Sequence, residues 1–169
     1  KQLPTLVSGG ITTAYYAGFL LGSWYTLRAL KQVGHIRVYA ALASLLSASV
    51  LITGVYDSPL IWIIMRSSTG FCFAGLYVVA ESWLNGLASN TFRGRLLAMY
   101  NVVTIGAYGA GQLLVFNFDA RTLTGFAFAA VVSSLAVIPV VMSEQAATPN
   151  VDNHTHITMR ELAKIVPTG

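Results

Sequence analysis

Long apolar stretches follow one another along this chain, separated by short polar connections. Five of them are about 20 residues long, the length that an α-helix needs to cross the hydrocarbon core of a bilayer. They cover residues 6–27, 38–55, 60–80, 96–116 and 123–142. The connections contain turn formers such as Gly34, Pro59 and Asn117, and they are short enough to make neighbouring helices antiparallel. The pattern predicts an all-α polytopic membrane helix bundle with five transmembrane helices.

Composition fits a protein whose main partner is the lipid bilayer. Charged residues make up 9% of the chain, against roughly a quarter in soluble domains. A net charge of +4 suits a nucleic-acid partner only when the basic residues form a patch, and here they fall between the apolar stretches. The single cysteine, Cys72, excludes an intramolecular disulfide and a Cys-x-x-Cys redox or zinc site within this sequence. We expect no nucleic acid, metal or cofactor.

Basic residues alternate between the connections. The first and third connections and the tail carry most of them: Arg28, Lys31 and Arg37, then Arg93 and Arg95, then Arg160 and Lys164. The second and fourth connections offer only Arg121. Since short cytoplasmic loops carry the excess of lysine and arginine, the tail and the odd-numbered connections are predicted to be cytoplasmic. The amino end is then outside.

The ends of the chain suggest a fragment. It begins with Lys1 rather than methionine, has no signal-peptide pattern, and stops after one short amphipathic segment. We therefore expect further chain on both sides. Residues 1–143 are predicted to form the transmembrane bundle, and residues 144–169 a cytoplasmic linker that contains the amphipathic segment.

Two charged residues lie in the third apolar stretch. Arg66 is inside it and Glu81 lies just beyond its end. Placing an ionised side chain in hydrocarbon costs about 2.5 to 3.5 kcal/mol on insertion scales, so such residues normally face a bundle interior or a wet cavity. Arg66 is predicted to handle substrate, with a structural charge as the alternative. Glu81 could pair with Arg37, Arg93 or Arg95, either to lock a closed state or only to join two loops.

Polar side chains recur at helical spacing on two stretches. Arg66, Gly70, Tyr77 and Glu81 share one face of the third stretch, and a stripe of polar residues follows the fourth. Such groups must find partners inside the protein. The predicted cavity-lining or substrate-binding residues are Arg66, Tyr77, Asn101, Thr104, Gln112 and Tyr16. For the stripe on the fourth stretch, hydrogen bonding between helices is the alternative interpretation.

Glycines mark places where helix backbones could touch. Gly18 and Gly22 form a GxxxG pair in the first stretch, a pattern that permits close helix packing. Gly70, Gly106 and Gly109 are predicted to pack helices in the same way. A moving interface between helices is the alternative role for these positions.

Several stretches together resemble the major facilitator superfamily, most closely its YcaD-like bacterial branch. The resemblance covers residues 10–141 and is carried by YYAGFLLGS, GHIRVYAALASLLSA, RSSTGFCFAGLYVVAESWLN and RGRLLAMYNVVTIGAYGAGQLL. In that family the amino-terminal half is a bundle of six helices. The resemblance therefore implies that the five stretches are the second to sixth helices, that the first precedes this sequence, and that the tail begins the cytoplasmic linker.

The family motifs match unevenly. In the signature loop between the second and third helices Gly34 and Arg37 fit, whereas Lys31 stands where the family has an acidic residue. That departure weakens the gating contact which the family motif implies for this loop. Arg66 and Gly70 match the fourth-helix motif, whose arginine is linked to substrate or proton handling. The antiporter motif needs a Gly-Pro pair, and Ala110 replaces its proline.

A secondary active transporter is the function that these observations favour. The sequence has no Walker loop, HExxH or GxSxG signature, so neither an enzyme nor an ATP-driven pump is indicated. We expect transport of a small solute by alternating access in a bacterial inner membrane, together with a carboxyl-terminal half of the same chain. Coupling to protons would run through Glu81 or through a partner of Arg66. The predicted gating or coupling residues are Glu81, Gly34, Arg37, Arg93 and Arg95. A non-transporting polytopic scaffold or interaction protein is the alternative.

Overall fold

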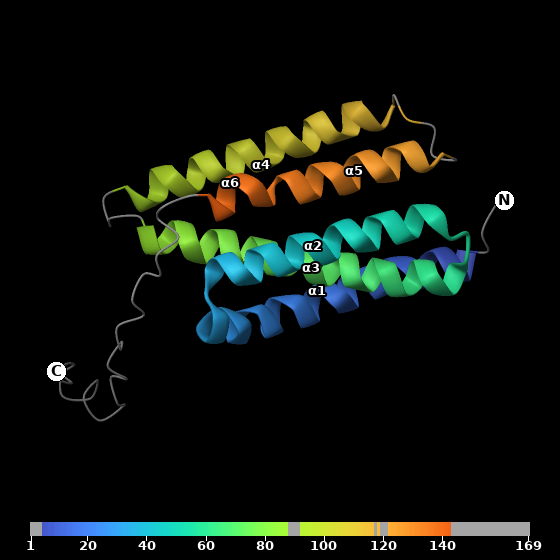
Figure 1. The fold of residues 1–169 in the computed structure, drawn as a ribbon, viewed down its shortest axis with the longest axis horizontal. Coiled ribbons are helices and arrows are strands. Elements are labelled where there is room, and N and C mark those ends of the chain that lie inside the picture. The colour runs from blue at the N-terminus through green and yellow to red at the C-terminus, as the bar shows by residue number, and fades with distance from the viewer. Residues whose placement is uncertain (1–4, 88–91, 117, 119–121, 143–169) are drawn as a thin grey trace, which may run out of the picture.

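The structure is a computed structural model in which residues 5–87, 92–116, 118 and 122–142 are described. Within those ranges the regular structure is entirely helical, which confirms the predicted all-α class. The helices are α1 (Thr5–Val33), α2 (His35–Val55), α3 (Pro59–Leu87), α4 (Arg93–Val115), α5 (Leu123–Leu135) and α6 (Val137–Val141). Successive long helices run in opposite directions along a common axis (Figure 1). The predicted linker, residues 144–169, lies outside the described residues.

The helices correspond one to one with the predicted stretches, apart from a break in the last. That break lies at Ala136, between α5 and α6. Pro139 explains it, because proline has no backbone N–H and its ring clashes with the carbonyl of the residue four positions earlier, here Leu135. The helix therefore ends at Leu135 and restarts after one residue.

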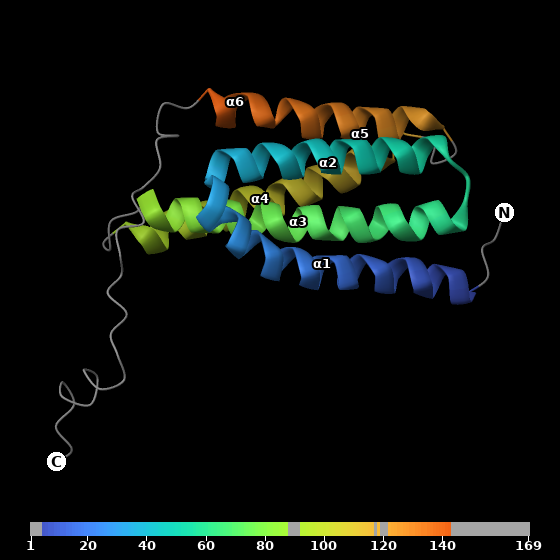
Figure 2. The ribbon, with the colours of Figure 1, turned by 60° about the horizontal axis from the view of Figure 1, so that its bottom comes forward.

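Three of the described helical segments are long and apolar enough to cross a membrane by length and composition alone. These are His35–Val55, Pro59–Gly86 and Leu123–Val141. The other two long helices, α1 with 29 residues and α4 with 23, have sufficient length but a less apolar composition. Figure 2 shows all of them lying alongside one another. The two less apolar helices depend more on their neighbours for a place in the bilayer.

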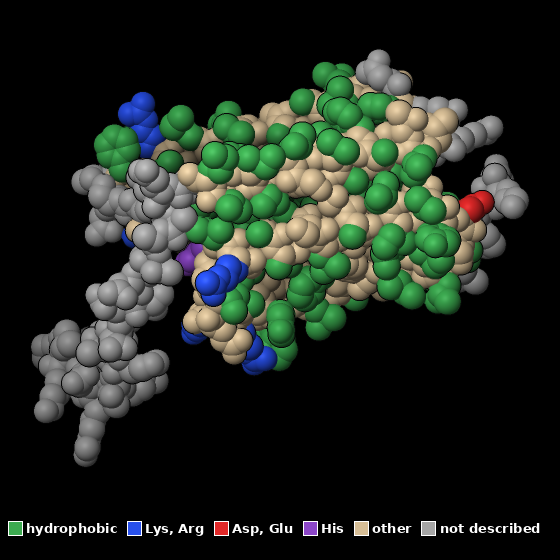
Figure 3. Space-filling model, viewed as in Figure 1, with side chains coloured by type: hydrophobic (Ala, Val, Ile, Leu, Met, Phe, Trp, Pro, Cys, Tyr) green, Lys and Arg blue, Asp and Glu red, His purple; other side chains and the backbone are tan. Residues whose placement is uncertain are grey.

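The packed core lies where α1, α2 and α3 meet. α3 contacts both α1 and α2 extensively, and α2 contacts α5 on its other side. The buried apolar cluster consists of Leu30, Val38, Leu42, Leu46, Cys72 and Val79. By contrast, α4 touches α3 only lightly and none of its residues is buried. Large apolar side chains cover the outside of the bundle, as expected for a surface that meets lipid (Figure 3).

Small hydroxyl side chains hold α2 to its neighbours. Ser49 and Ser68 share a hydrogen bond of 2.8 Å between α2 and α3. On the opposite side Ser47 donates to the Ala130 carbonyl at 2.8 Å and accepts from the Ser134 hydroxyl at 2.8 Å. Polar groups inside a membrane protein need such internal partners. α2 is thus fixed on both sides.

The glycines of α1 and α3 lie at a close helix crossing. A Cβ atom added at Gly18 would clash with the Ser67 carbonyl oxygen, and one at Gly70 would clash with the Tyr15 carbonyl oxygen. Gly22 faces the Phe71 backbone in the same way. Only residues without a Cβ allow the two backbones to approach this closely.

The α4 glycines differ from expectation. A Cβ atom at Gly106 or Gly109 would meet nothing within 4 Å among the described residues. No described helix reaches that face of α4, so the packing role of these two glycines stays a prediction.

One residue connects α1 to α2. Gly34 has a φ of 84°, in the left-handed region that favours glycine, and its N–H donates to the Leu30 carbonyl at 3.1 Å. This turn, the end of α3 and the start of α4 lie at the same end of the bundle (Figure 1). The basic side chains visible in Figure 3 gather at that end. Basic side chains are therefore concentrated at one end of the helix axis, as the sequence predicts.

Candidate functional site

Arg66 lies on α3 about two turns, or roughly 10 Å, from the start of the helix. Its side chain is exposed, and among the described residues it makes no hydrogen bond or ion pair. One turn further along, the backbone of Tyr15 packs directly against Gly70. Arg66 lies near enough to Tyr15 to act on its hydroxyl electrostatically. The result is a guanidinium group inside a membrane-spanning helix without a compensating carboxylate in the described chain.

Four tyrosines gather beyond Arg66 along the same side of α3. The Tyr77 and Tyr108 hydroxyls share a hydrogen bond that joins α3 to α4. Tyr15 of α1 and Tyr100 of α4 lie near Tyr77. We call Tyr15, Tyr77, Tyr100 and Tyr108 the tyrosine cluster. It supplies several hydroxyl groups that can donate hydrogen bonds to a bound molecule.

The tyrosine cluster borders a cavity between α3 and α4. This α3–α4 cavity has a volume of about 510 Å³, which is within the usual range for small-molecule sites. Its walls come from three helices: Tyr39 of α2, Phe73, Leu76, Tyr77 and Ala80 of α3, and Tyr100, Val103, Thr104, Ala107 and Tyr108 of α4. Mostly apolar walls with a few hydroxyls are typical of a site that orients a small solute.

The structure places the six predicted site residues in different surroundings. Tyr77 and Thr104 line the α3–α4 cavity. The Thr104 hydroxyl donates to the Tyr100 carbonyl at 2.8 Å, so its hydrogen is already used within α4. Arg66, Tyr16, Asn101 and Gln112 are exposed and do not line the cavity. The predicted set is thus not one compact site within the described chain.

Sequence reasoning missed Tyr15, Tyr100 and Tyr108 as members of the site. A signal was present, because Tyr100, Thr104 and Tyr108 recur every four residues and therefore share one face of α4. No comparable signal could have found Tyr39, which reaches the cavity from α2.

The expected ion pairs at the basic end are absent from the described chain. Glu81 is exposed and pairs with none of Arg37, Arg93 or Arg95. Arg93 instead donates to the Asn85 carbonyl at 3.5 Å, and the Arg95 guanidinium lies 6.0 Å from the centre of the Phe92 ring. A pairing of Glu81 with these loops, whether to lock a closed state or only to join them, therefore stays a prediction.

Two other interactions are present at the basic end of the bundle. The charge of Glu81 acts on Tyr100, a member of the tyrosine cluster. In addition, His35 at the start of α2 and Ser82 near the end of α3 share a hydrogen bond of 3.0 Å. Glu81 is thereby connected to the candidate site rather than to the basic loops.

We expect the Tyr77–Tyr108 hydrogen bond to contribute modestly to the attachment of α4. Replacing Tyr77 or Tyr108 with phenylalanine removes the bond but keeps the ring, so each single variant should lose about 0.6 kcal/mol, the average for hydrogen bonds between membrane helices. The double variant should cost no more than either single one. A double-mutant cycle on thermal unfolding of the full-length protein in detergent measures this, and additive losses would contradict a direct bond.

The chain resembles a group of bacterial membrane proteins. Proteins named "Uncharacterized MFS-type transporter YcaD" from Salmonella arizonae, Salmonella newport and Salmonella heidelberg are each 32% identical to it over 122 residues. The match covers 72% of this chain and 32% of each relative, so the chain spans about a third of their length. No family model and no solved structure matches it. By this similarity the chain is a YcaD-like member of the major facilitator superfamily, an integral membrane protein that corresponds to part of the length of its relatives.

Proposed function

We propose that the protein to which this chain belongs is a secondary active transporter that moves a small solute across the membrane by alternating access. The observation that carries the proposal is Arg66, an exposed guanidinium on a membrane-spanning helix without a partner in the described chain. Charges held at such positions usually serve a substrate or ion pathway. Arg66 and the tyrosine cluster would contact the solute, and no catalytic step is involved.

The placement of the candidate site supports this proposal. In secondary carriers, solutes bind near the middle of the bilayer between repeated helix bundles. The α3–α4 cavity lies between these two helices, and α4 contacts α3 only lightly. The carboxyl-terminal half of the same protein would close this side and form the rest of the solute site.

The charge distribution supports an orientation with the α1–α2 and α3–α4 connections in the cytoplasm. Lys31, Arg37, Arg93 and Arg95 all lie at that end, whereas Asp57 lies in the α2–α3 connection at the other. In a bacterial inner membrane the tail would then be cytoplasmic. Cysteines placed singly at Lys31 and at Asp57 in intact cells should differ in labelling by a membrane-impermeant maleimide, and only the Asp57 position should react.

Uptake by the reconstituted full-length protein tests the transport proposal. The protein would be inserted in liposomes, and uptake of a panel of radiolabelled small solutes would be recorded with and without an imposed pH gradient. Gradient-dependent uptake of one solute is the expected result. If a protein that is folded by size-exclusion chromatography takes up none of the panel, a non-transporting scaffold becomes the better interpretation.

Glu81 is proposed to carry the coupled proton. Its charge acts on Tyr100 at the edge of the α3–α4 cavity, so its protonation state can influence the site. Replacing Glu81 with glutamine removes the carboxyl group and should flatten the dependence of flux on pH. The matched control is Asp57→Asn, another exposed acid at the opposite end of the bundle, which should keep the wild-type profile. An unchanged profile in Glu81→Gln would assign the coupling to another group.

A further inference from the structure

Aromatic rings make up half of the wall of the α3–α4 cavity. They come from three helices: Tyr39 of α2, Phe73 and Tyr77 of α3, and Tyr100 and Tyr108 of α4. The other residues on this wall are aliphatic, apart from Thr104, and none of the described residues that line it is charged. Aromatic rings make favourable offset-stacked or edge-to-face contacts with another ring. The wall therefore favours a solute with an aromatic body over one with an aliphatic body.

Hydroxyl groups on the same wall can orient such a ring. In the hydrogen bond between Tyr77 and Tyr108 one hydroxyl donates and the other accepts, so the accepting hydroxyl keeps its own hydrogen for a bound molecule. A small number of polar groups on a mostly apolar wall is what fixes the orientation of a ligand. The cavity thus recognises shape, aromatic character and a hydrogen-bond acceptor, and any charge on the solute must be met outside it.

Arg66 lies on the face of α3 that leads to this wall. It precedes Phe73 by about two helical turns and Tyr77 by about three, so the three residues share one face of the helix. At 1.5 Å per residue, the distance along α3 from Arg66 to Phe73 is about 10 Å. Tyr15 of α1 lies near both Arg66 and Tyr108. The guanidinium group is therefore placed beyond one end of the cavity, where it can meet the polar end of a solute whose ring lies between α3 and α4.

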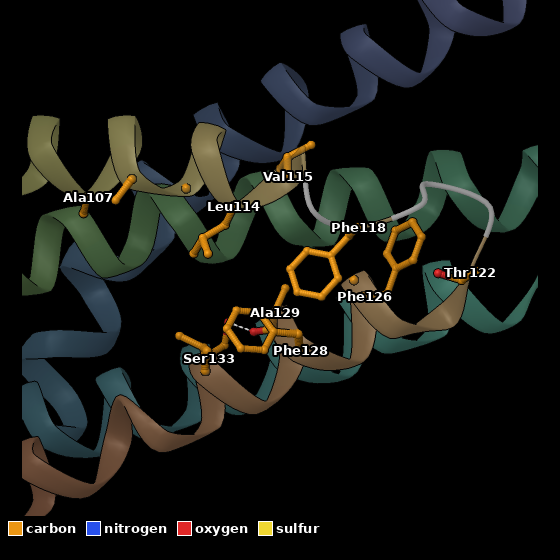
Figure 4. Close-up of a pocket in the computed structure, with 13 residues that line it drawn as sticks. Ala107, Leu114, Val115, Phe118, Thr122, Phe126, Phe128, Ala129 and Ser133 are labelled. Carbon is orange, nitrogen blue, oxygen red and sulfur yellow. Dashed lines mark hydrogen bonds between the residues drawn. The ribbon is translucent and has the colours of Figure 1, made fainter.

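The larger groove between α4 and α5 does not offer the same combination of groups. Its volume is about 630 Å³, and Figure 4 shows the rings of Phe118, Phe126 and Phe128 on its wall. Of its two hydroxyl side chains, Ser133 donates to a backbone carbonyl one turn earlier at 2.8 Å, and Thr122 also has a partner. None of the described residues that line the groove is charged. It provides apolar contact alone, so it is the α3–α4 cavity that suits a polar solute.

We propose that the transported solute is an aromatic carboxylate, which places its ring in the α3–α4 cavity and its carboxylate on Arg66. This inference rests on the proposed transport function and names its substrate class. The planar fork of donors on arginine matches the two oxygens of a carboxylate, and hydrogen bonds between two charged groups are stronger than those between neutral ones. The solute would supply the anion that Arg66 lacks in the described chain.

Charge distinguishes this solute from two other aromatic ones. Aromatic rings also attract ammonium groups, but the described acidic residues, Asp57 and Glu81, do not line the cavity, and the charge of Arg66 repels a cation. An amino acid could place its carboxylate on Arg66, but Glu81 could not then hold its ammonium group, because about 22 Å of α3 separates the two residues. An anion without an ammonium group is therefore the best fit.

Binding to the full-length protein in detergent tests the substrate class without measuring flux. A ligand that binds only the native protein raises its apparent melting temperature by mass action, and the dependence on concentration gives an apparent Kd. The aromatic carboxylates are hydrocinnamate, phenylacetate and indoleacetate. Three probes match hydrocinnamate in size: its amide has no charge, cyclohexylpropanoate has no aromatic ring, and phenylpropylamine is a cation. Hydrocinnamate should bind about tenfold or more tightly than its amide or the amine, and about twofold to tenfold more tightly than cyclohexylpropanoate.

Variants assign the two ends of the solute to their contacts. Arg66→Ala should weaken hydrocinnamate about tenfold to a hundredfold and leave the affinity for its amide unchanged. Phe73→Leu should weaken hydrocinnamate about twofold to tenfold, with little effect on cyclohexylpropanoate. Phe71→Leu is the matched control, because Phe71 is also on α3 but lies beside the Tyr25 ring and does not line the cavity. This control should keep the wild-type affinity for hydrocinnamate.

Three results would overturn the proposal. Binding of phenylpropylamine as tight as that of hydrocinnamate would mean that the rings hold a cation. Equal affinity for hydrocinnamate and either its amide or cyclohexylpropanoate would remove the role of the charge or of the ring. If none of the three aromatic carboxylates raises the melting temperature, the substrate class is wrong. Gradient-dependent uptake of another solute would in that case leave the transport proposal standing, so the two failures are distinguishable.

Discussion

Replacing Arg66 with alanine in the full-length protein is expected to reduce solute flux about tenfold to a hundredfold while the protein still inserts in the membrane. A hydrogen bond from a charged donor contributes about 1.5 to 3 kcal/mol, and each 1.4 kcal/mol corresponds to roughly a factor of ten. Insertion should not suffer, because the substitution removes a charge from a membrane-spanning segment. Uptake in liposomes, normalised to the amount of folded protein, measures the effect.

Two companion variants separate charge from geometry. Arg66→Lys keeps the positive charge but loses the planar fork of donors, so intermediate flux would mean that the fork matters. Arg28→Ala removes another exposed arginine, whose guanidinium lies 3.7 Å from the centre of the Trp24 ring, and should leave flux unchanged. Wild-type flux in Arg66→Ala would make this arginine a structural charge and remove the main support for its role in transport.

The second large effect is expected at the crossing of α1 and α3. Gly18→Ala and Gly22→Ala should each destabilise the protein by about 1 to 3 kcal/mol, the usual cost of overpacking. The added methyl group would clash with a backbone carbonyl oxygen of α3, and a backbone cannot move aside as a flexible side chain can. The apparent melting temperature of the full-length protein in detergent measures the change.

A glycine of α4 supplies a control for which the opposite change in stability is expected. Gly109→Ala is the same substitution in another long helix, but its methyl group meets nothing within 4 Å in the described chain. Alanine is better than glycine in a helix interior by about 0.5 to 1 kcal/mol, so this variant should be neutral or slightly stabilising. Equal destabilisation of Gly18→Ala and Gly109→Ala would mean that an unseen helix packs on that face of α4, or that the α1–α3 crossing is looser than described.

The contrast between these glycines also shows what the sequence could predict. Apolar length and turn residues located every long helix, because both are local properties of the chain. A GxxxG pair shows where another helix backbone can pack closely, but it does not show which helix packs there. Gly18 has α3 beside it, whereas Gly109 has no described neighbour, and the presence of a glycine alone does not distinguish the two.

The candidate site was predicted less completely for a related reason. Helical spacing placed Tyr77 and Thr104 on polar faces, and both line the α3–α4 cavity. Asn101 and Gln112 belong to the same stripe on α4 but point away from the cavity wall, since the rotation of α4 against α3 depends on contacts between distant parts of the chain. For Glu81 the sequence named Arg37, Arg93 and Arg95 as partners, and no ion pair joins it to them among the described residues.

The loose attachment of α4 has a consequence for how the protein is made. α1, α2 and α3 can pack together as soon as they leave the ribosome, since each contacts a near neighbour in the chain. α4 is less apolar and finds little to hold it at that stage. Among the described helices it is therefore the one whose integration depends most on contacts made outside α1, α2 and α3.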